Sequence, residues 1–166
     1  MDQVEIEAPE DRLYTPDHEW ARKRRQTVLV GVTPFAVAQM GKLDCVRFSV
    51  GRGDLVKAGQ IYANVDVRKF TFDVLSPVSG RVVQVHRALC EQPEPLALDA
   101  YGKGWLMYVR PEDPRKLARE WSRLVDAAAY REAARISEPL KDGDPDEEWR
   151  ARKAAEAAAR AAQSKA

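Results

Sequence analysis

One lysine near the middle of the chain stands where a covalently attached group could be presented. Lys69 follows an apolar run that ends at Val67 and precedes Thr71–Leu75, a second run with strand-like alternation. The sequence Ser-Pro-Val-Ser-Gly at residues 76–80 then supplies a turn. An amine at a turn projects away from a sheet, where a modifying enzyme reaches it, and rigid flanking strands give the attached group a fixed pivot. The spacing therefore fits a group-carrier hairpin.

The same residues also allow a plainer interpretation, in which Lys69 is a solvated turn lysine. The sequence has no phosphate loop and no GxSxG or HExxH motif. His18 lies beside Glu19, but a lone adjacent pair is more typical of a surface contact than of a catalytic dyad. Neither His18 nor His86 has a cysteine or carboxylate at metal-ligand spacing. We therefore expect no catalytic site and no metal site.

The two cysteines, Cys45 and Cys90, are far apart in the sequence and form no CxxC pair. Two isolated thiols in a cytosolic protein are predicted to be reduced and packed. A redox pair or a metal role is the alternative interpretation, and the sequence leaves it open.

Composition and charge narrow the class of protein. With 166 residues, 45% of them hydrophobic and 32% charged, the chain has the balance of a soluble globular protein. A net charge of +1 argues against a nucleic-acid binder, and we interpret the basic run at residues 22–25 as a solvated hairpin turn. No apolar stretch is long enough to span a bilayer, and the N-terminus resembles no secretory signal or transit peptide. We expect a cytoplasmic protein that binds neither membranes nor nucleic acid.

Short β-type runs separated by glycine and proline fill the chain from Leu13 to Arg110. Such a series favours a small sandwich or barrel over a parallel α/β sheet. A short helix is predicted at Pro34–Met40, because Thr33-Pro34 signals a helix start and Gly41 is available as its C-cap. The predicted strands are Thr27–Val32, Cys45–Val50, Gln60–Val67, Thr71–Leu75, Gly80–His86 and Gly104–Val109.

Beyond Arg110 the pattern becomes helical. Asp113-Pro114 fits an N-cap followed by proline at the first helical position. The apolar residues Leu117, Trp121, Leu124 and Val125 recur at helical spacing and predict a helix that docks on the β body. We divide the chain into a mobile leader (1–12), a domain with its docked C-terminal helix (13–136) and an Ala/Arg-rich helical or disordered tail (137–166).

Five stretches of the chain match one known family in order and spacing: residues 14–20, 30–36, 51–59, 76–80 and 101–106. Through them, Leu13 to Ile136 resemble the glycine cleavage H-protein family. In that family the lipoyl lysine lies seven residues before the serine of the Ser-Pro turn, which corresponds to Lys69, and Asp66 matches an acidic residue three positions earlier. The resemblance implies a mainly β protein with helices (α+β), a lipoyl/biotinyl-carrier hybrid barrel-sandwich with a short helix in its N-terminal half, a C-terminal helix and an extra helical tail.

The resemblance also implies a function. Lipoate would be attached to Lys69 as an amide by a lipoate ligase or transferase, and Asp66 and Asp73 would help that enzyme recognise the hairpin. The lipoyl group would act as a swinging arm that carries an aminomethyl group in glycine cleavage. Its partners would be a pyridoxal-phosphate decarboxylase, an aminomethyltransferase and dihydrolipoamide dehydrogenase, and the carrier itself would catalyse no step.

The residues beside Lys69 depart from the family pattern. The family usually has Glu-Ser-Val-Lys-Ala, whereas this chain has Asp66-Val67-Arg68-Lys69-Phe70. Two further interpretations are therefore open. One is an H-protein-like lipoate carrier in another pathway, such as the oxidation of sulfur compounds, with sulfur-oxidation enzymes as partners. The other is an unlipoylated structural or regulatory adaptor with the same fold.

Overall fold

The computed structural model of the chain describes residues 6–68, 70–136 and 153. Its strands form two antiparallel sheets. The larger sheet has the order β1-β2-β3-β9-β8-β5 and consists of β1 (Leu13–Tyr14), β2 (Glu19–Arg24), β3 (Thr27–Val32), β9 (Met107–Arg110), β8 (Gly80–Val85) and β5 (Leu55–Val56). The smaller sheet has the order β4-β6-β7 and consists of β4 (Cys45–Phe48), β6 (Ile61–Val67) and β7 (Phe70–Leu75).

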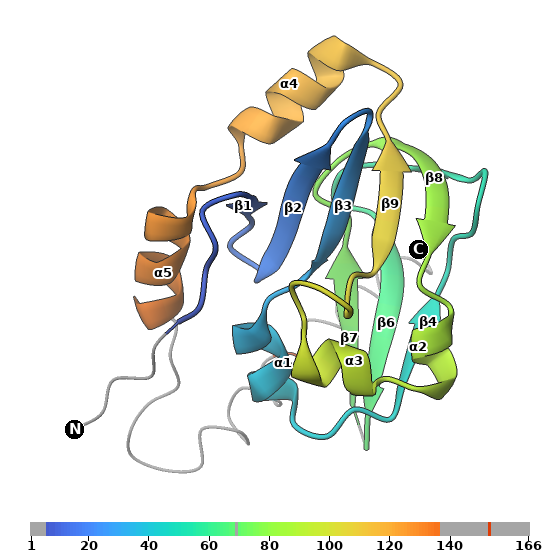
Figure 1. Cartoon of the computed structure of the whole chain (residues 1–166), viewed down its shortest axis with the longest axis vertical. Helices are drawn as coiled ribbons and strands as arrows, with labels where there is room; N and C mark the ends of the chain where they lie inside the picture. Colours follow the sequence, from blue (N-terminus) through green and yellow to red (C-terminus); the bar gives the residue numbers. More distant parts are fainter. Residues whose placement is uncertain (1–5, 69, 137–152, 154–166) are drawn as a thin grey trace, which may run out of the picture.

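The two sheets lie face to face around one apolar core, as Figure 1 shows with the smaller sheet behind the larger. Alternation along each strand produces this core, because successive side chains of a strand point to opposite faces of its sheet. In β6 and β7, for example, Val65, Val67, Phe72 and Val74 are buried while the residues between them are partly exposed. The fold is α+β with a sandwich of antiparallel sheets, as the sequence predicted.

Three short helices gather at one end of the sandwich (Figure 1): α1 (Pro34–Met40), α2 (Ala88–Glu91) and α3 (Glu94–Leu98). The start of α1 follows the predicted chemistry. Thr33 is its N-cap and accepts a hydrogen bond from the backbone N–H of Ala36, and Pro34 occupies the first turn. Gly41 at its C-cap has φ of 83°, a value that favours glycine.

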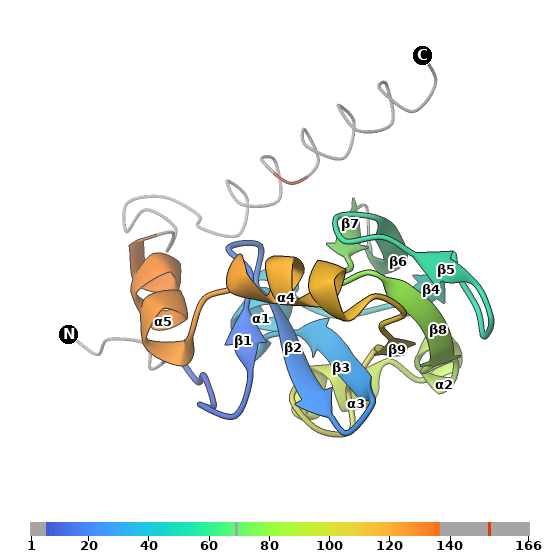
Figure 2. The ribbon, with the colours of Figure 1, turned by 90° about the horizontal axis from the view of Figure 1, so that it is seen from above.

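The C-terminal segment contains two helices, α4 (Pro114–Ser122) and α5 (Ala127–Ile136), where the sequence predicted one. Asp113 caps α4 as expected, accepting from the N–H groups of Arg115 and Lys116. The break falls before α5 because Val125 exchanges two backbone hydrogen bonds of 2.8 Å with Tyr14 of β1. Figure 2 shows α4 lying across the strand ends and α5 beside β1.

A second apolar cluster joins α5 to the N-terminal part of the chain. Tyr14 and Tyr130 stack with ring centroids 4.6 Å apart, and Trp20 is fully buried near them. Ile6 and Ala8 are buried in the same cluster, and Arg131 Nη1 donates to the carbonyl of Ala8. Residues 6–12, which we expected to be mobile, therefore pack against the domain. The few apolar side chains of this segment are enough to hold it in place, because α5 offers an apolar surface against which they pack.

The predicted helix at residues 34–40 and strand at residues 27–32 have the predicted bounds, and the other predicted strands differ by a few residues. Sequence patterns missed β2, because three basic side chains in a row hide its alternation, and missed α2 and α3, which are too short to show periodicity. The predicted tail, 137–166, lies outside the described residues except for Lys153. No helix in the described part of the chain is long and apolar enough to cross a membrane.

Candidate functional site

The hairpin formed by β6 and β7 holds the site that the sequence predicted. Val67 pairs with Phe70, so two residues of the chain, Arg68 and Lys69, connect the strands. Arg68 has φ of 33°, the positive sign that two-residue hairpin loops require, and its side chain is exposed. Its backbone N–H donates to Asp44 Oδ2 at 2.6 Å. Lys69 lies outside the described residues, so its role as an attachment residue stays a prediction.

In the two strands that lead to this turn, one face packs into the core and the other face is polar. Val65, Val67 and Phe72 point into the core between the sheets. Residues of the opposite parity point outward, and the pairing of Asn64 with Asp73 and of Asp66 with Thr71 places all four on one outer face. A buried face on one side and an open polar face on the other give a rigid hairpin with a surface that a partner can reach.

Asp66 lies on the outer face and forms hydrogen bonds with Arg47 and Thr71. Its carboxylate accepts from Arg47 Nε at 2.6 Å, from Arg47 Nη2 at 3.0 Å and from Thr71 Oγ1 at 2.7 Å. The hydrogen bonds from the Arg47 guanidinium hold the pKa of Asp66 below its usual value, although partial burial opposes them. The Asp66 side chain keeps 28% of its surface exposed, so it is an ionised group that a partner enzyme can contact.

Asp73 lies on the same face, where its Oδ1 accepts from Asn64 Nδ2 at 2.7 Å. The structure therefore brings together the two aspartates that the sequence singled out. Each already has a hydrogen-bonding partner within the protein, which fixes the position of its carboxylate. Recognition of these groups by a ligase stays a prediction.

Glu19 ties the base of the hairpin to the larger sheet. Its Oε2 accepts from the backbone N–H of Leu75, the last residue of β7, at 2.8 Å, and its Oε1 lies 3.0 Å from Thr15 Oγ1. Glu19 is only 4% exposed, and burial raises the pKa of its carboxyl group to about 8. The contact fixes the end of β7 relative to β2, so it positions the whole hairpin.

The expected surface contact of His18 and Glu19 was wrong, because both side chains are buried. They form no dyad, since each turns to a different partner. His18 Nδ1 lies 2.9 Å from the hydroxyl of Tyr130, which also contacts Thr33 Oγ1 at 2.7 Å. Burial lowers the pKa of His18 to about 4, so the imidazole is neutral near pH 7. Both residues have structural roles. Glu19 holds the end of β7 through Leu75, and His18 holds α5 through Tyr130.

The Ser-Pro turn after β7 is held from outside by helix α4. Glu120 accepts from the backbone N–H of Ser79 at 2.9 Å and from its hydroxyl at 2.5 Å. The Ser79 hydroxyl oxygen also accepts from the backbone N–H of Ala58. Glu120 is buried, and no sequence motif marked it, because a single glutamate in an amphipathic helix is usually solvated. It fixes the turn that connects β7 to β8.

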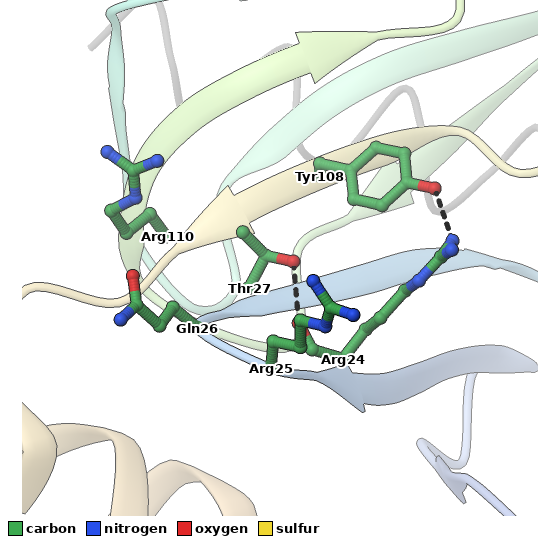
Figure 3. A pocket seen from close by; sticks show the side chains of 6 residues that line it. All are labelled: Arg24, Arg25, Gln26, Thr27, Tyr108 and Arg110. Carbon is green, nitrogen blue, oxygen red and sulfur yellow. Dashed lines mark hydrogen bonds between the residues drawn. The ribbon is translucent and has the colours of Figure 1, made fainter.

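A shallow cationic pocket lies at the opposite end of the sandwich from the hairpin turn (Figures 1 and 3). Arg24 donates to the hydroxyl of Tyr108 at 3.2 Å there, and Thr27 donates to the carbonyl of Arg24. The basic run that we interpreted as a turn lies partly in β2, and only Arg25 and Gln26 form the turn. The pocket is lined by Arg24, Arg25, Gln26, Thr27, Tyr108 and Arg110. Its position separates it from the predicted attachment site.

Comparison with known proteins gives a consistent result. Residues 12–136 match the family described as Glycine cleavage H-protein. The glycine cleavage system H proteins of an Anaeromyxobacter species and of Thermus thermophilus are each 38% identical to the chain, over 126 and 128 residues. These matches cover 76% of this chain and 94% and 95% of the relatives. A crystal structure of a glycine cleavage system H protein from Mycobacterium marinum is similar with a TM-score of 0.64 and 34% identity, covering 74% of this chain and 94% of that one.

Proposed function

Because the chain belongs to the glycine cleavage H-protein family, we propose that it is a lipoyl carrier with Lys69 as its attachment residue. The observation that carries the proposal is the hairpin of β6 and β7, whose two connecting residues are Arg68 and Lys69. Seven residues separate Lys69 from Ser76, the serine of the Ser-Pro turn. Family membership, spacing and the position of the hairpin support Lys69 as the attachment residue.

The residues around the turn suit a tether that must pivot from a fixed point. Asp44 fastens the backbone of Arg68, and Glu19 and Glu120 fasten the two ends of the segment that follows. Lipoate bound to Lys69 would supply a dithiolane that accepts and passes on the transferred group. The protein's own part is to hold the attachment residue, keep the hairpin rigid and present its polar face, without catalysing a step.

Glycine cleavage is the pathway that the matched relatives support, so we infer that the transferred group is the aminomethyl group. The partners would then be the decarboxylase, the aminomethyltransferase and dihydrolipoamide dehydrogenase. We further infer that the enzyme that attaches lipoate contacts Asp66 and Asp73. Both lie on the outer face of the hairpin, and Asp66 is ionised and partly exposed.

Mass spectrometry of the protein made in cells with an active lipoate ligase tests the attachment residue. We expect a lipoyl-sized addition on the peptide that contains Lys69, and its loss in Lys69→Arg. Lys57→Arg is the matched control, because Lys57 is an exposed lysine that directly follows β5. An unmodified wild-type protein in cells whose other lipoyl proteins are modified would overturn the proposal and favour the adaptor.

The recognition role of the aspartates needs a rate measurement. We expect Asp66→Asn and Asp73→Asn to slow lipoylation by purified ligase about 10-fold, the effect of losing roughly one charge-assisted hydrogen bond. Glu112→Gln is the control, since Glu112 is an exposed carboxylate that is ion-paired to Arg81. Equal rates for all three variants would show that the ligase reads neither aspartate.

A further inference from the structure

The structure brings the two cysteines together at the end of the sandwich that holds the hairpin turn. The Sγ atoms of Cys45 and Cys90 lie 3.5 Å apart, although 45 positions separate them in the chain. Cys45 begins β4 and pairs with Asp66 of β6, and Cys90 lies in α2, which packs against β4. Both are free thiols. The sequence-based expectation of two isolated thiols was wrong in this respect.

The contact rests on elements that are firmly placed. Leu89 of α2 is fully buried in the main core, and the backbone N–H of His86 donates to the carbonyl of Leu106 just before the helix. On the other side, β4 is held by its ladder with β6. A disulfide requires the two sulfur atoms to approach from 3.5 Å to about 2.05 Å.

We propose that Cys45 and Cys90 are a dithiol site that low-molecular-weight disulfides oxidise reversibly to an intramolecular disulfide. Cys90 is exposed, so its thiolate attacks one sulfur of a disulfide such as oxidised glutathione and expels one thiol. Cys45, 3.5 Å away, then loses its proton and attacks Cys90 Sγ, which expels the second thiol. Two protein thiols and one small disulfide become one protein disulfide and two small thiols.

The environment of Cys45 determines which of the two thiols reacts first with the small disulfide. Partial burial and the neighbouring Cys90 raise the pKa of the Cys45 thiol, and Asp66 acts in the same direction. The Arg47 guanidinium opposes them. Cys45 therefore stays protonated in the resting protein and acts as the resolving thiol, while the exposed Cys90 meets the oxidant.

The disulfide would join the two sheets covalently. Helix α2 follows β8 of the larger sheet, and β4 is an edge strand of the smaller sheet. Figure 1 shows both elements at the lower end of the sandwich, on the side of β6 that leads to the hairpin turn. Oxidation would therefore restrain the movement of the smaller sheet relative to the larger one. This inference stands apart from the proposed function, because it does not require lipoate.

The test is to treat the full-length, purified protein with oxidised glutathione and then to measure its mass and thermal unfolding. We expect a loss of two hydrogens, a cross-linked peptide pair containing Cys45 and Cys90, and a Tm higher by about 5–10 °C that dithiothreitol reverses. The expected stabilisation arises because the bond closes a long loop in the unfolded chain.

Two single substitutions distinguish this mechanism from a lasting mixed disulfide on Cys90 and from disulfide-linked dimers. Cys45→Ser should accumulate a stable mixed disulfide with glutathione on Cys90, since the resolving thiol is gone. Cys90→Ser should react more slowly, because the remaining thiol is less accessible. A wild-type protein that keeps glutathione on Cys90, or that forms only disulfide-linked dimers, would overturn the proposal.

Discussion

Replacement of Glu19 by glutamine is expected to remove a large part of the dependence of stability on pH between about 5 and 8. Burial raises the pKa of this carboxyl group from 4.5 to about 8 in the folded protein. Glutamine imitates the protonated form: its carbonyl can accept from the N–H of Leu75, and its amide can donate to Thr15 Oγ1. Both contacts of Glu19 would therefore persist in the variant.

The direction of the pH dependence follows from which state, folded or unfolded, binds the proton of Glu19 more tightly. Since the folded-state pKa is the higher one, the contribution of Glu19 to stability is complete below pH 4.5 and declines as the pH rises toward 8. From pH 5 to 7.5 the decline amounts to about 3 kcal/mol, at 1.36 kcal/mol for each unit. Because glutamine imitates the protonated form, Glu19→Gln should exceed the free energy of unfolding of the wild type by about 1 kcal/mol at pH 5 and by about 4 kcal/mol at pH 7.5.

His18 titrates with the opposite sign. Its pKa is lowered from 6.5 to about 4, so its contribution is present above pH 6.5 and is lost as the pH falls toward 4. Both proteins share this contribution, and the comparison of variant with wild type cancels it.

Urea unfolding followed by tryptophan fluorescence at several pH values between 5 and 8 measures the difference. Glu112→Gln is the control, because Glu112 is an exposed carboxylate and its replacement should leave the pH profile unchanged. A Glu19→Gln protein that is less stable than the wild type at pH 7.5 would refute the reasoning. It would mean that Glu19 is ionised when folded and that its hydrogen bonds outweigh the cost of burial.

Two further substitutions test the packing that positions the hairpin. A Cβ atom at Gly31 would lie 2.7 Å from the indole of Trp20, so Gly31→Ala should lower the free energy of unfolding by about 1–3 kcal/mol in urea titrations; an unchanged midpoint would contradict the close approach. Glu120→Ala removes both hydrogen bonds to Ser79 and should cost about 2–3 kcal/mol, measured in the same way, whereas a loss below about 0.5 kcal/mol would mean that water replaces the carboxylate.

Local chemistry made much of the fold predictable. The β-branched run of residues 27–32 and the Thr33-Pro34 start of α1 each specify one conformation through contacts within a few residues. Asp113 capped α4 for the same reason. The strand β2 escaped prediction because its three consecutive basic residues carry no apolar alternation, and its identity depends on pairing with β3.

The sequence by itself placed Lys69 between two strand-like runs and seven residues before Ser76, and the resemblance to the H-protein family selected it as the attachment residue. Only the tertiary structure decided how that hairpin is held. Glu19 and Glu120 reach it from β2 and α4, and Cys90 meets Cys45 from α2, across 56, 41 and 45 positions of the chain. Such contacts depend on how the sheets pack, and burial is what changes the pKa of Glu19. A sequence pattern shows neither these contacts nor the burial of Glu19, because both arise only when distant segments pack together and exclude water.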